Sequence, residues 1–248
     1  MNKIYIFSDA HFGSGSAESE GKKAKYFFSL VDRIRREGAD LVINGDLFDF
    51  WFEYKYAIPR FHFSILSQLS LLTSSGINVH YVAGNHDFWL DSFMTNEIGI
   101  TLHDEEMVIR QEDFHTYIRH GDGLLKSDHL YRFLKKILRH PLNIKLYRML
   151  HPDIGMPLAL YFSHLSRDSK KDKQHCDEDY RRFAFDKIDQ DYRIVVLGHT
   201  HRPTMEKYKD GWYLNTGNWM ETFTYAIIEN GTPELLAWNG THGVEYQD

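Results

Sequence analysis

The sequence has one cysteine, Cys176, among its 248 residues. A single thiol excludes an intrachain disulfide and a structural zinc site built from several sulfur ligands, and it favours a reducing compartment. The chain also lacks any run of the roughly 18 apolar residues that a membrane-spanning helix needs. Repeats, low-complexity tails and flexible linkers are absent, and the first apolar run starts at Ile4, too early for a signal peptide. These absences predict a soluble or membrane-peripheral protein.

Charge is unevenly spread along the chain. A net charge of −6 disfavours binding to nucleic acid, which draws on several Lys or Arg contacts. Residues 124–173, however, contain eleven Lys or Arg against four Asp. A basic segment therefore interrupts an acidic chain, whose hydrophobic content of 42% is enough to fill a sizeable core.

Five short segments each follow an apolar run and carry side chains that bind metals. The preceding runs are β-branched and aromatic, which predicts buried strands. Ligands collect at the carboxyl ends of strands in open α/β sheets, so we expect the five segments to meet at one place. They are Asp9-Ala10-His11, Gly45-Asp46, Gly84-Asn85-His86-Asp87, His120-Gly121-Asp122 and Gly198-His199-Thr200-His201.

Carboxylate, amide and imidazole together suit a divalent cation that must hold phosphate and still polarise a water. Two such cations about 3.5–4 Å apart can share a carboxylate and assist an in-line displacement at phosphorus. A lone Asp-x-His is weak support, because Asp also caps turns. Gly-His-x-His is stronger, since alternation on an extended segment puts both imidazoles on one side. All five in this order favour a dinuclear metal site over a purely structural role.

The order D-x-H, G-D, G-N-H-D, H-G-D and G-H-x-H resembles the calcineurin-like metallophosphoesterase superfamily. Within it, residues 45–51 and the insertion after His120 are similar to the UDP-2,3-diacylglucosamine diphosphatases of lipid A biosynthesis. The likeness covers nearly the whole chain. It implies an α/β (α+β) fold, a sandwich of two mixed β-sheets flanked by helices. We expect residues 1–248 to form a single metallophosphoesterase domain, with residues 124–173 as an inserted helical lid over the active site.

The resemblance implies two divalent metal ions, with manganese the usual ion in the lipid A enzymes. The donor set also suits iron and zinc. Asp46 would bridge the two ions. The first would also be held by Asp9, His11 and His201, and the second by Asn85, His120 and His199.

His86 follows Asn85 and is a catalytic candidate that could contact the substrate phosphate, stabilise charge or protonate the leaving oxygen. Asp87 or Asp122 could orient an imidazole, or could equally stabilise loops. The best-known lipid A enzymes have Arg at the position of His86. A His there makes phosphate contact pH-dependent near neutrality.

The basic segment has helical periodicity. Leu130, Phe133, Leu134 and Leu138 recur at three- and four-residue steps, and Pro141, Pro152 and Pro157 divide the segment into separate helices. One reading is a helical hairpin that packs its apolar face on the core. The other is a basic, apolar lid that binds acyl chains and lies on an anionic membrane surface.

Substrate contacts can be nominated by the same resemblance. The lid residues could also form a solvated basic turn. The candidates are Asn85, His86, Asp128, Tyr131, Ser166, Arg167, Lys170, Lys173 and His199.

The remaining sequence predicts scaffold. Residues 20–37 and 59–74 are expected to be helices that alternate with the first three strands. Residues 215–219 could border the site, although a plain turn is favoured. Strands are expected at residues 204–208, 212–215, 222–228 and 234–238.

The leading hypothesis is hydrolysis of UDP-2,3-diacylglucosamine to UMP and 2,3-diacylglucosamine 1-phosphate, at the cytoplasmic face of the inner membrane of a Gram-negative bacterium. One alternative is a metallophosphoesterase that acts on another nucleotide, a phosphodiester or a DNA end. Another is a non-catalytic scaffold of the same fold, which predicts missing ligands. Acyl-chain preference and oligomeric state stay open.

Overall fold

Two mixed β-sheets form the centre of the computed structural model, which describes residues 3–110, 114–125, 129–168 and 176–246. The larger sheet has the order β12 (Gly243–Glu245), β11 (Thr232–Trp238), β10 (Thr224–Glu229), β1 (Ile4–Phe7), β2 (Asp40–Asn44), β3 (Val79–Val82) and β4 (Thr101–His103). The smaller has the order β5 (Glu106–Arg110), β6 (His115–Arg119), β7 (Tyr192–Leu197), β9 (Gly211–Asn215) and β8 (Thr204–Tyr208).

Parallel pairing extends from β1 to the β4 edge of the larger sheet and occupies the middle of the smaller sheet. Strands β1 to β4 pair in parallel, as do β6, β7 and β9, whereas β10 to β12, β5 and β8 pair antiparallel with their neighbours. The predicted sandwich of two mixed sheets is therefore confirmed. The carboxyl ends of β1, β2 and β3 share one edge of the larger sheet, where the first three motifs begin.

Buried side chains fill both faces of the central strands. Ile4 and Ile6 of β1 pack with Val42, Ile118 and Val196 in the layer between the sheets. The alternate residues of the same strands pack under the outer helices. Because both faces are covered, these strands are continuous apolar runs instead of alternating ones.

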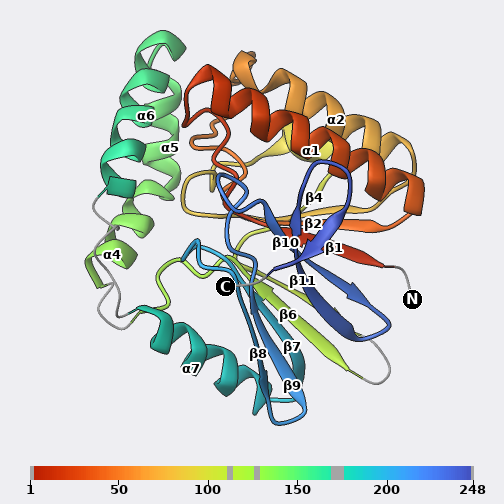
Figure 1. Ribbon diagram of the computed structural model, residues 1–248. Helices are drawn as coiled ribbons and strands as arrows, with labels where there is room; N and C mark the ends of the chain where they lie inside the picture. The colour runs from red at the N-terminus through yellow and green to blue at the C-terminus, as the bar shows by residue number, and fades with distance from the viewer. Residues whose placement is uncertain (1–2, 111–113, 126–128, 169–175, 247–248) are drawn as a thin grey trace.

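Helices α1 (Ala17–Glu37) and α2 (Phe63–Ser74) cover the outer face of the larger sheet (Figure 1). Ser16 caps α1 by accepting from the Ser19 amide, and Gly38 ends the helix in the left-handed conformation. The short helices η1 (Arg60–His62) and α3 (Ser92–Asn96) lie in loops of this half. Helix α7 (Cys176–Ile188) lies along the smaller sheet, with Tyr180 and Ala184 buried against its strands.

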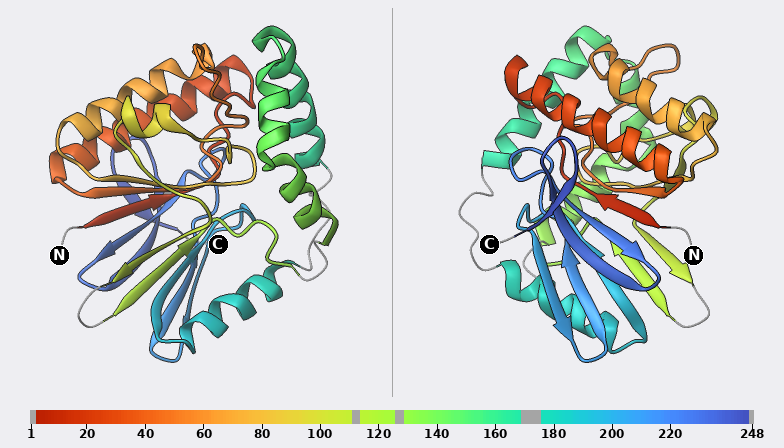
Figure 2. Two further views of the ribbon diagram at one scale, coloured as in Figure 1. Left: turned by 180° about the vertical axis from the view of Figure 1, so that it is seen from behind. Right: turned by 45° about the vertical axis from the view of Figure 1, so that its right-hand side comes forward.

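Three helices stand together at one end of the molecule (Figure 2). They are α4 (His129–Leu138), α5 (Pro141–Arg148) and α6 (Pro152–Asp168). Pro141 and Pro152 begin helices, as predicted. Pro157 does not divide the segment, because it lies inside α6 near its start, where it removes one backbone donor while the following turns continue the helix. No helix in the described ranges is long and apolar enough to cross a membrane.

Candidate metal centre

The five predicted motifs meet where strands from both sheets end. The loops after β1, β2 and β3 supply Asp9, Asp46 and Asn85, and the loops after β6 and β7 supply His120 and His199. Backbone hydrogen bonds join the loops. The Asp9 amide donates to Gly45 O at 3.1 Å, and the Gly198 amide donates to His120 O at 2.8 Å. Residues distant in the sequence therefore share one rigid edge.

Positive φ angles are concentrated in these loops. Asp9, His11, Asp46, His199 and His201 all have φ between 43° and 67°. Residues other than Gly rarely adopt this backbone conformation, which costs of order 1–3 kcal/mol per residue. Such strain persists where surrounding contacts enforce it, and here it aims the donor atoms inward.

Glycines allow the loops to approach one another. A Cβ on Gly45 would lie 2.5 Å from His120 Nδ1, and a Cβ on Gly84 would collide with the side chain and amide of Asp46. These contacts are too short for any side chain. The glycines of the motifs are therefore needed for close packing of the loops that carry the donors.

Asp9, His11 and His201 form the first donor group. Asp9 Oδ1 lies 3.1 Å from His201 Nε2 and 3.9 Å from His11 Nε2. The two Nε2 atoms are 3.3 Å apart. One cation could therefore contact a carboxylate oxygen and two imidazoles.

Asp46, His120 and His199 form the second group. His120 Nε2 lies 3.2 Å from Asp46 Oδ2 and 3.3 Å from His199 Nδ1. The same Asp46 oxygen is 3.7 Å from His11 Nε2 of the first group. A single carboxylate oxygen therefore lies between the two groups, which is the position of a bridging ligand.

Hydrogen bonds fix which atoms face the centre. His120 Nδ1 is 2.8 Å from Asn44 O, so it carries the hydrogen and leaves Nε2 for a metal. Asp9 Oδ2 accepts from the His199 amide at 3.0 Å and from the Ser8 hydroxyl. Asp46 Oδ1 accepts from the His86 amide at 2.9 Å. The other oxygen of each carboxylate remains for a cation.

The residues fit divalent metal ions. Asn85 Oδ1 is buried and has no hydrogen-bond donor among the described residues, an arrangement that is costly unless a cation occupies the site. Burial alone would lower the pKa of His120, but Asp46 and Asp9 raise it to about 10. Burial opposes ionisation of Asp46, yet the neighbouring His120 and His86 hold its pKa well below the usual range. Such a site attracts positive charge.

Asp87 is fully buried among loop groups. Its carboxylate accepts from the amides of Gly84, Asp46 and Phe48 at 3.0–3.3 Å and from the Tyr81 hydroxyl. These contacts match the loop-stabilising alternative for this residue. Burial and the nearby Asp46 raise the pKa of Asp87 to about 7.

Asp122 connects the His120 loop to α4. Its Oδ2 accepts from the Tyr131 hydroxyl and from Lys135 Nζ, each at 2.7 Å. Tyr131, which was predicted to contact the substrate, therefore links α4 to the His120 loop.

His86 lies against Asp49, which sequence reasoning did not nominate. Its Nδ1 is 3.1 Å from Asp49 O and 3.8 Å from Asp49 Oδ1. Asp49 Oδ1 is also 3.4 Å from His11 Nδ1. The sequence signal that could have identified Asp49 is its position as a second carboxylate three residues after Asp46. Ser163 of α6, with its Oγ 2.7 Å from His86 Nδ1, had no such signal.

Two other groups border the centre: Lys23, which was not predicted to do so, and residues 215–219, for which a plain turn was favoured. Lys23 of α1 is buried, and its Nζ donates to the carbonyls of Ala10 and His11 at 2.9 Å. The turn after β9 is more than a plain turn. Thr216 Oγ1 lies 2.6 Å from Ser8 Oγ, and Asn218 Nδ2 donates to His201 O at 3.1 Å.

The structure does not describe the side chains of the remaining nominated lid residues. Ser166 and Arg167 belong to α6, where the structure describes their backbone only. Asp128, Lys170 and Lys173 lie outside the described residues.

The chain is similar to several known proteins. The UDP-2,3-diacylglucosamine hydrolase of Porphyromonas gingivalis is 29% identical over 93% of this chain and 95% of its own. That of Pseudomonas syringae pv. syringae is 30% identical over 84% and 83%. The solved structure of Yfce, a phosphoesterase from E. coli, covers 98% of this chain and 96% of its own at 16% identity, with a TM-score of 0.48. The model of the Calcineurin-like phosphoesterase family matches residues 2–203, and the chain belongs to that family.

Proposed function

We propose that this protein hydrolyses the pyrophosphate of UDP-2,3-diacylglucosamine, giving UMP and 2,3-diacylglucosamine 1-phosphate. Family membership establishes a phosphoesterase that uses divalent metal ions. Relatives named for this substrate are similar along most of the chain, which supports the substrate. The single observation that carries the chemistry is the Asp46 oxygen between two donor groups. The donor positions of the pattern are filled, so the non-catalytic alternative lacks support.

The chain's own residues would divide the work around the metals. The bound ions, which we propose to be manganese, would supply Lewis acidity at the phosphoryl oxygens and activate water. Asp9, His11 and His201 would hold one ion, and His120, His199 and Asn85 the other, with Asp46 shared. His86 lies beside both groups and would contact the substrate phosphate.

Helices α4–α6 support an amphiphilic substrate and a membrane-facing location. No residue of α5 is fully buried. Tyr147 packs on the rings of Phe52 and Trp89, whereas Leu142 and Leu146 remain exposed. Basic side chains alternate with the exposed apolar ones. We therefore propose a lid that binds acyl chains at the cytoplasmic face of the inner membrane of a Gram-negative bacterium. The exposed large apolar residues are Phe133, Leu134, Ile137, Leu142, Leu146, Met149, Leu150, Ile154, Leu158, Tyr161 and Phe162.

The substrate assignment is tested by turnover of the manganese-loaded protein on UDP-2,3-diacylglucosamine. UMP release is compared with cleavage of bis(p-nitrophenyl) phosphate, a generic diester, and with metal-free protein. Metal-dependent UMP release far above cleavage of the generic ester is expected. Cleavage of the generic ester alone would overturn the substrate and favour another nucleotide or phosphodiester, while leaving the metal chemistry intact.

A further inference from the structure

A side chain of α6 reaches the candidate catalytic histidine. Ser163 Oγ lies 2.7 Å from His86 Nδ1, although 77 positions separate the two residues. The same hydroxyl donates to Asp49 O at 2.9 Å. Ser163 is half-buried, whereas its neighbours Tyr161 and Phe162 are exposed. A polar contact of the lid is therefore made at the metal centre itself.

The acceptors around His86 determine the position of its ring hydrogen. Asp49 O can only accept, and it lies 3.1 Å from Nδ1. The one hydrogen of Ser163 is directed to the same carbonyl, so Ser163 Oγ can accept from the imidazole. Both neighbours therefore favour a hydrogen on Nδ1.

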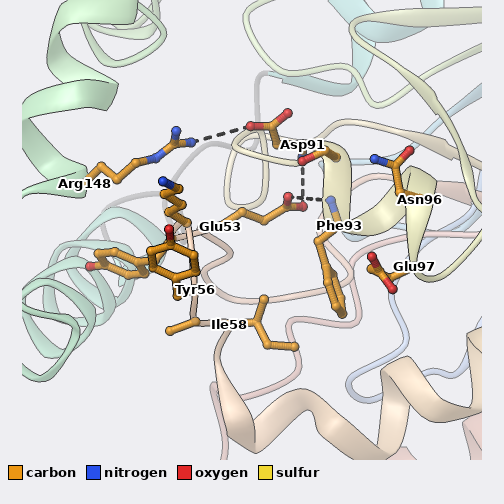
Figure 3. Close-up of a pocket in the computed structure, with 12 residues that line it drawn as sticks. Glu53, Tyr56, Ile58, Asp91, Phe93, Asn96, Glu97 and Arg148 are labelled. Carbon is orange, nitrogen blue, oxygen red and sulfur yellow. Dashed lines mark hydrogen bonds and ion pairs between the residues drawn. The ribbon is translucent and has the colours of Figure 1, made fainter.

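Further contacts join the lid to the loop that carries His86. Trp89 Nε1 donates to Leu138 O at the end of α4, at 3.2 Å. Arg148 of α5 pairs with Asp91 at 3.5 Å, and both line a cavity of about 440 Å³ together with Glu53 and Phe93 (Figure 3). The Tyr147 ring of α5 also packs on Trp89, with ring centroids 5.1 Å apart, so polar and aromatic contacts together join the lid to this loop. Of the contacts named here, only that of Ser163 reaches the imidazole.

We propose that Ser163 is a positioning residue, which makes the orientation and tautomer of His86 depend on the docking of α6. The inference rests on the proposed role of His86 at the substrate phosphate. Docking of the lid then does two things together: it covers the centre and holds the His86 ring through Nδ1. A lid that bends away releases the imidazole.

The simpler possibility is that Ser163 only fastens the lid. In that case its loss raises KM for the lipid substrate and leaves a small diester unaffected, because the diester does not need the lid. If Ser163 positions His86, its loss lowers kcat for both substrates. The small diester therefore separates the two roles.

The test compares Ser163→Val with Ser163→Thr, which have nearly the same shape and differ in the hydroxyl. For Ser163→Val, kcat on bis(p-nitrophenyl) phosphate is expected to fall about three- to tenfold, the effect of one lost hydrogen bond. Ser163→Thr is expected to keep most of the activity. Ser74→Ala, at an exposed serine of α2, controls for generic loss of a helix serine. Thermal unfolding of every variant checks that it folds.

An unchanged kcat on the small diester in Ser163→Val overturns the proposal. If the wild-type protein cleaves the diester but releases no UMP, the substrate assignment fails, and the dependence on Ser163 still decides the inference. Should neither be cleaved, long-range ¹H–¹⁵N spectra of zinc-loaded, ¹⁵N-histidine-labelled protein decide, with His86 assigned by His86→Gln. We expect hydrogen on Nδ1, and a weaker, faster-exchanging Nδ1–H signal in Ser163→Val. Hydrogen on Nε2, or a signal unchanged by Ser163→Val, contradicts the proposal.

Discussion

At the scale of single residues, the metal centre depends on side chains that hold the donors as well as on the donors. Lys23 illustrates this. Its buried ammonium binds the carbonyls of Ala10 and His11 and pairs with Glu20 at 2.7 Å. Glu20 in turn accepts from the amides of Gly13 and Gly15. Helix α1 thereby secures the strained loop that carries Asp9 and His11.

Replacing Lys23 by Met should therefore weaken metal binding. Two buried carbonyls would lose their donor, at a cost of about 1–3 kcal/mol each, and the loop would relax. We expect manganese affinity, measured by titration calorimetry, to fall about tenfold or more, since 1.4 kcal/mol is a factor of ten. Lys22→Met, at the exposed neighbouring lysine, is the matched control. Equal affinities for the two variants would show that the contact is dispensable.

Metal binding should also release protons. In the metal-free protein, burial lowers the pKa of His120, but Asp46 and Asp9 raise it to about 10, so the ring is protonated at neutral pH. A metal must displace that proton, and affinity should therefore rise with pH up to about 10. Calorimetry at pH 7 in buffers of different ionisation enthalpy should show about one proton released through this residue. A binding constant that does not change with pH would contradict this.

A buried histidine away from the centre makes stability sensitive to acid. His62 packs against Phe48 and Phe61 with ring centroids 4.2 Å away, and burial lowers its pKa to about 3. The unfolded chain takes up a proton near pH 6.5, whereas the folded chain does not. The contribution of His62 to the free energy of unfolding is therefore fully present above pH 6.5. It falls as the pH drops toward 3, by about 2 kcal/mol at pH 5. His62→Phe should flatten the pH dependence of the free energy of unfolding between pH 7 and 5, measured in urea. An unchanged slope would exclude His62 as the cause.

At the scale of elements, the sequence predicted those helices, strands and loops whose positions are determined by neighbouring residues. The central strands, the ligand loops after them and the starts of α5 and α6 follow from runs of apolar residues closed by Gly, Asp or Pro. The short edge strands β4, β5 and β12 were missed, because three to five residues with little burial carry no periodic signal. Ser163 and Lys23 could not be predicted, since their roles depend on helices meeting loops distant in sequence.

The lid helices should bind anionic membrane through their exposed apolar side chains. Phe133 and Met149 are 61% and 77% exposed. Replacing both by Glu should reduce sedimentation with vesicles of phosphatidylglycerol several-fold, because charge is added where apolar contact is needed. Leu71→Glu, at an exposed apolar residue of α2, should leave binding unchanged. Equal binding of all variants would place the membrane contact elsewhere.

At the scale of the whole molecule, two sheets are held in register by the centre that they share. The larger sheet supplies Asp9, Asp46 and Asn85, and the smaller supplies His120 and His199. Neither sheet has a complete donor set alone. Asn44 Nδ2 donates to Arg119 O and so joins the two sheets beside the loops. The metal centre therefore forms only when the two sheets pack together.

The most direct test of the account is whether Asp46 joins two metal ions. Electron paramagnetic resonance of the manganese-loaded protein should show a spin-coupled pair, with two ions per chain by elemental analysis. Asp46→Asn should give an uncoupled signal and lose phosphodiester hydrolysis, while Asp104→Asn, at an exposed carboxylate, should match the wild type. A single uncoupled ion in the wild-type protein, or a coupled and active Asp46→Asn variant, would contradict a dinuclear centre bridged by this carboxylate.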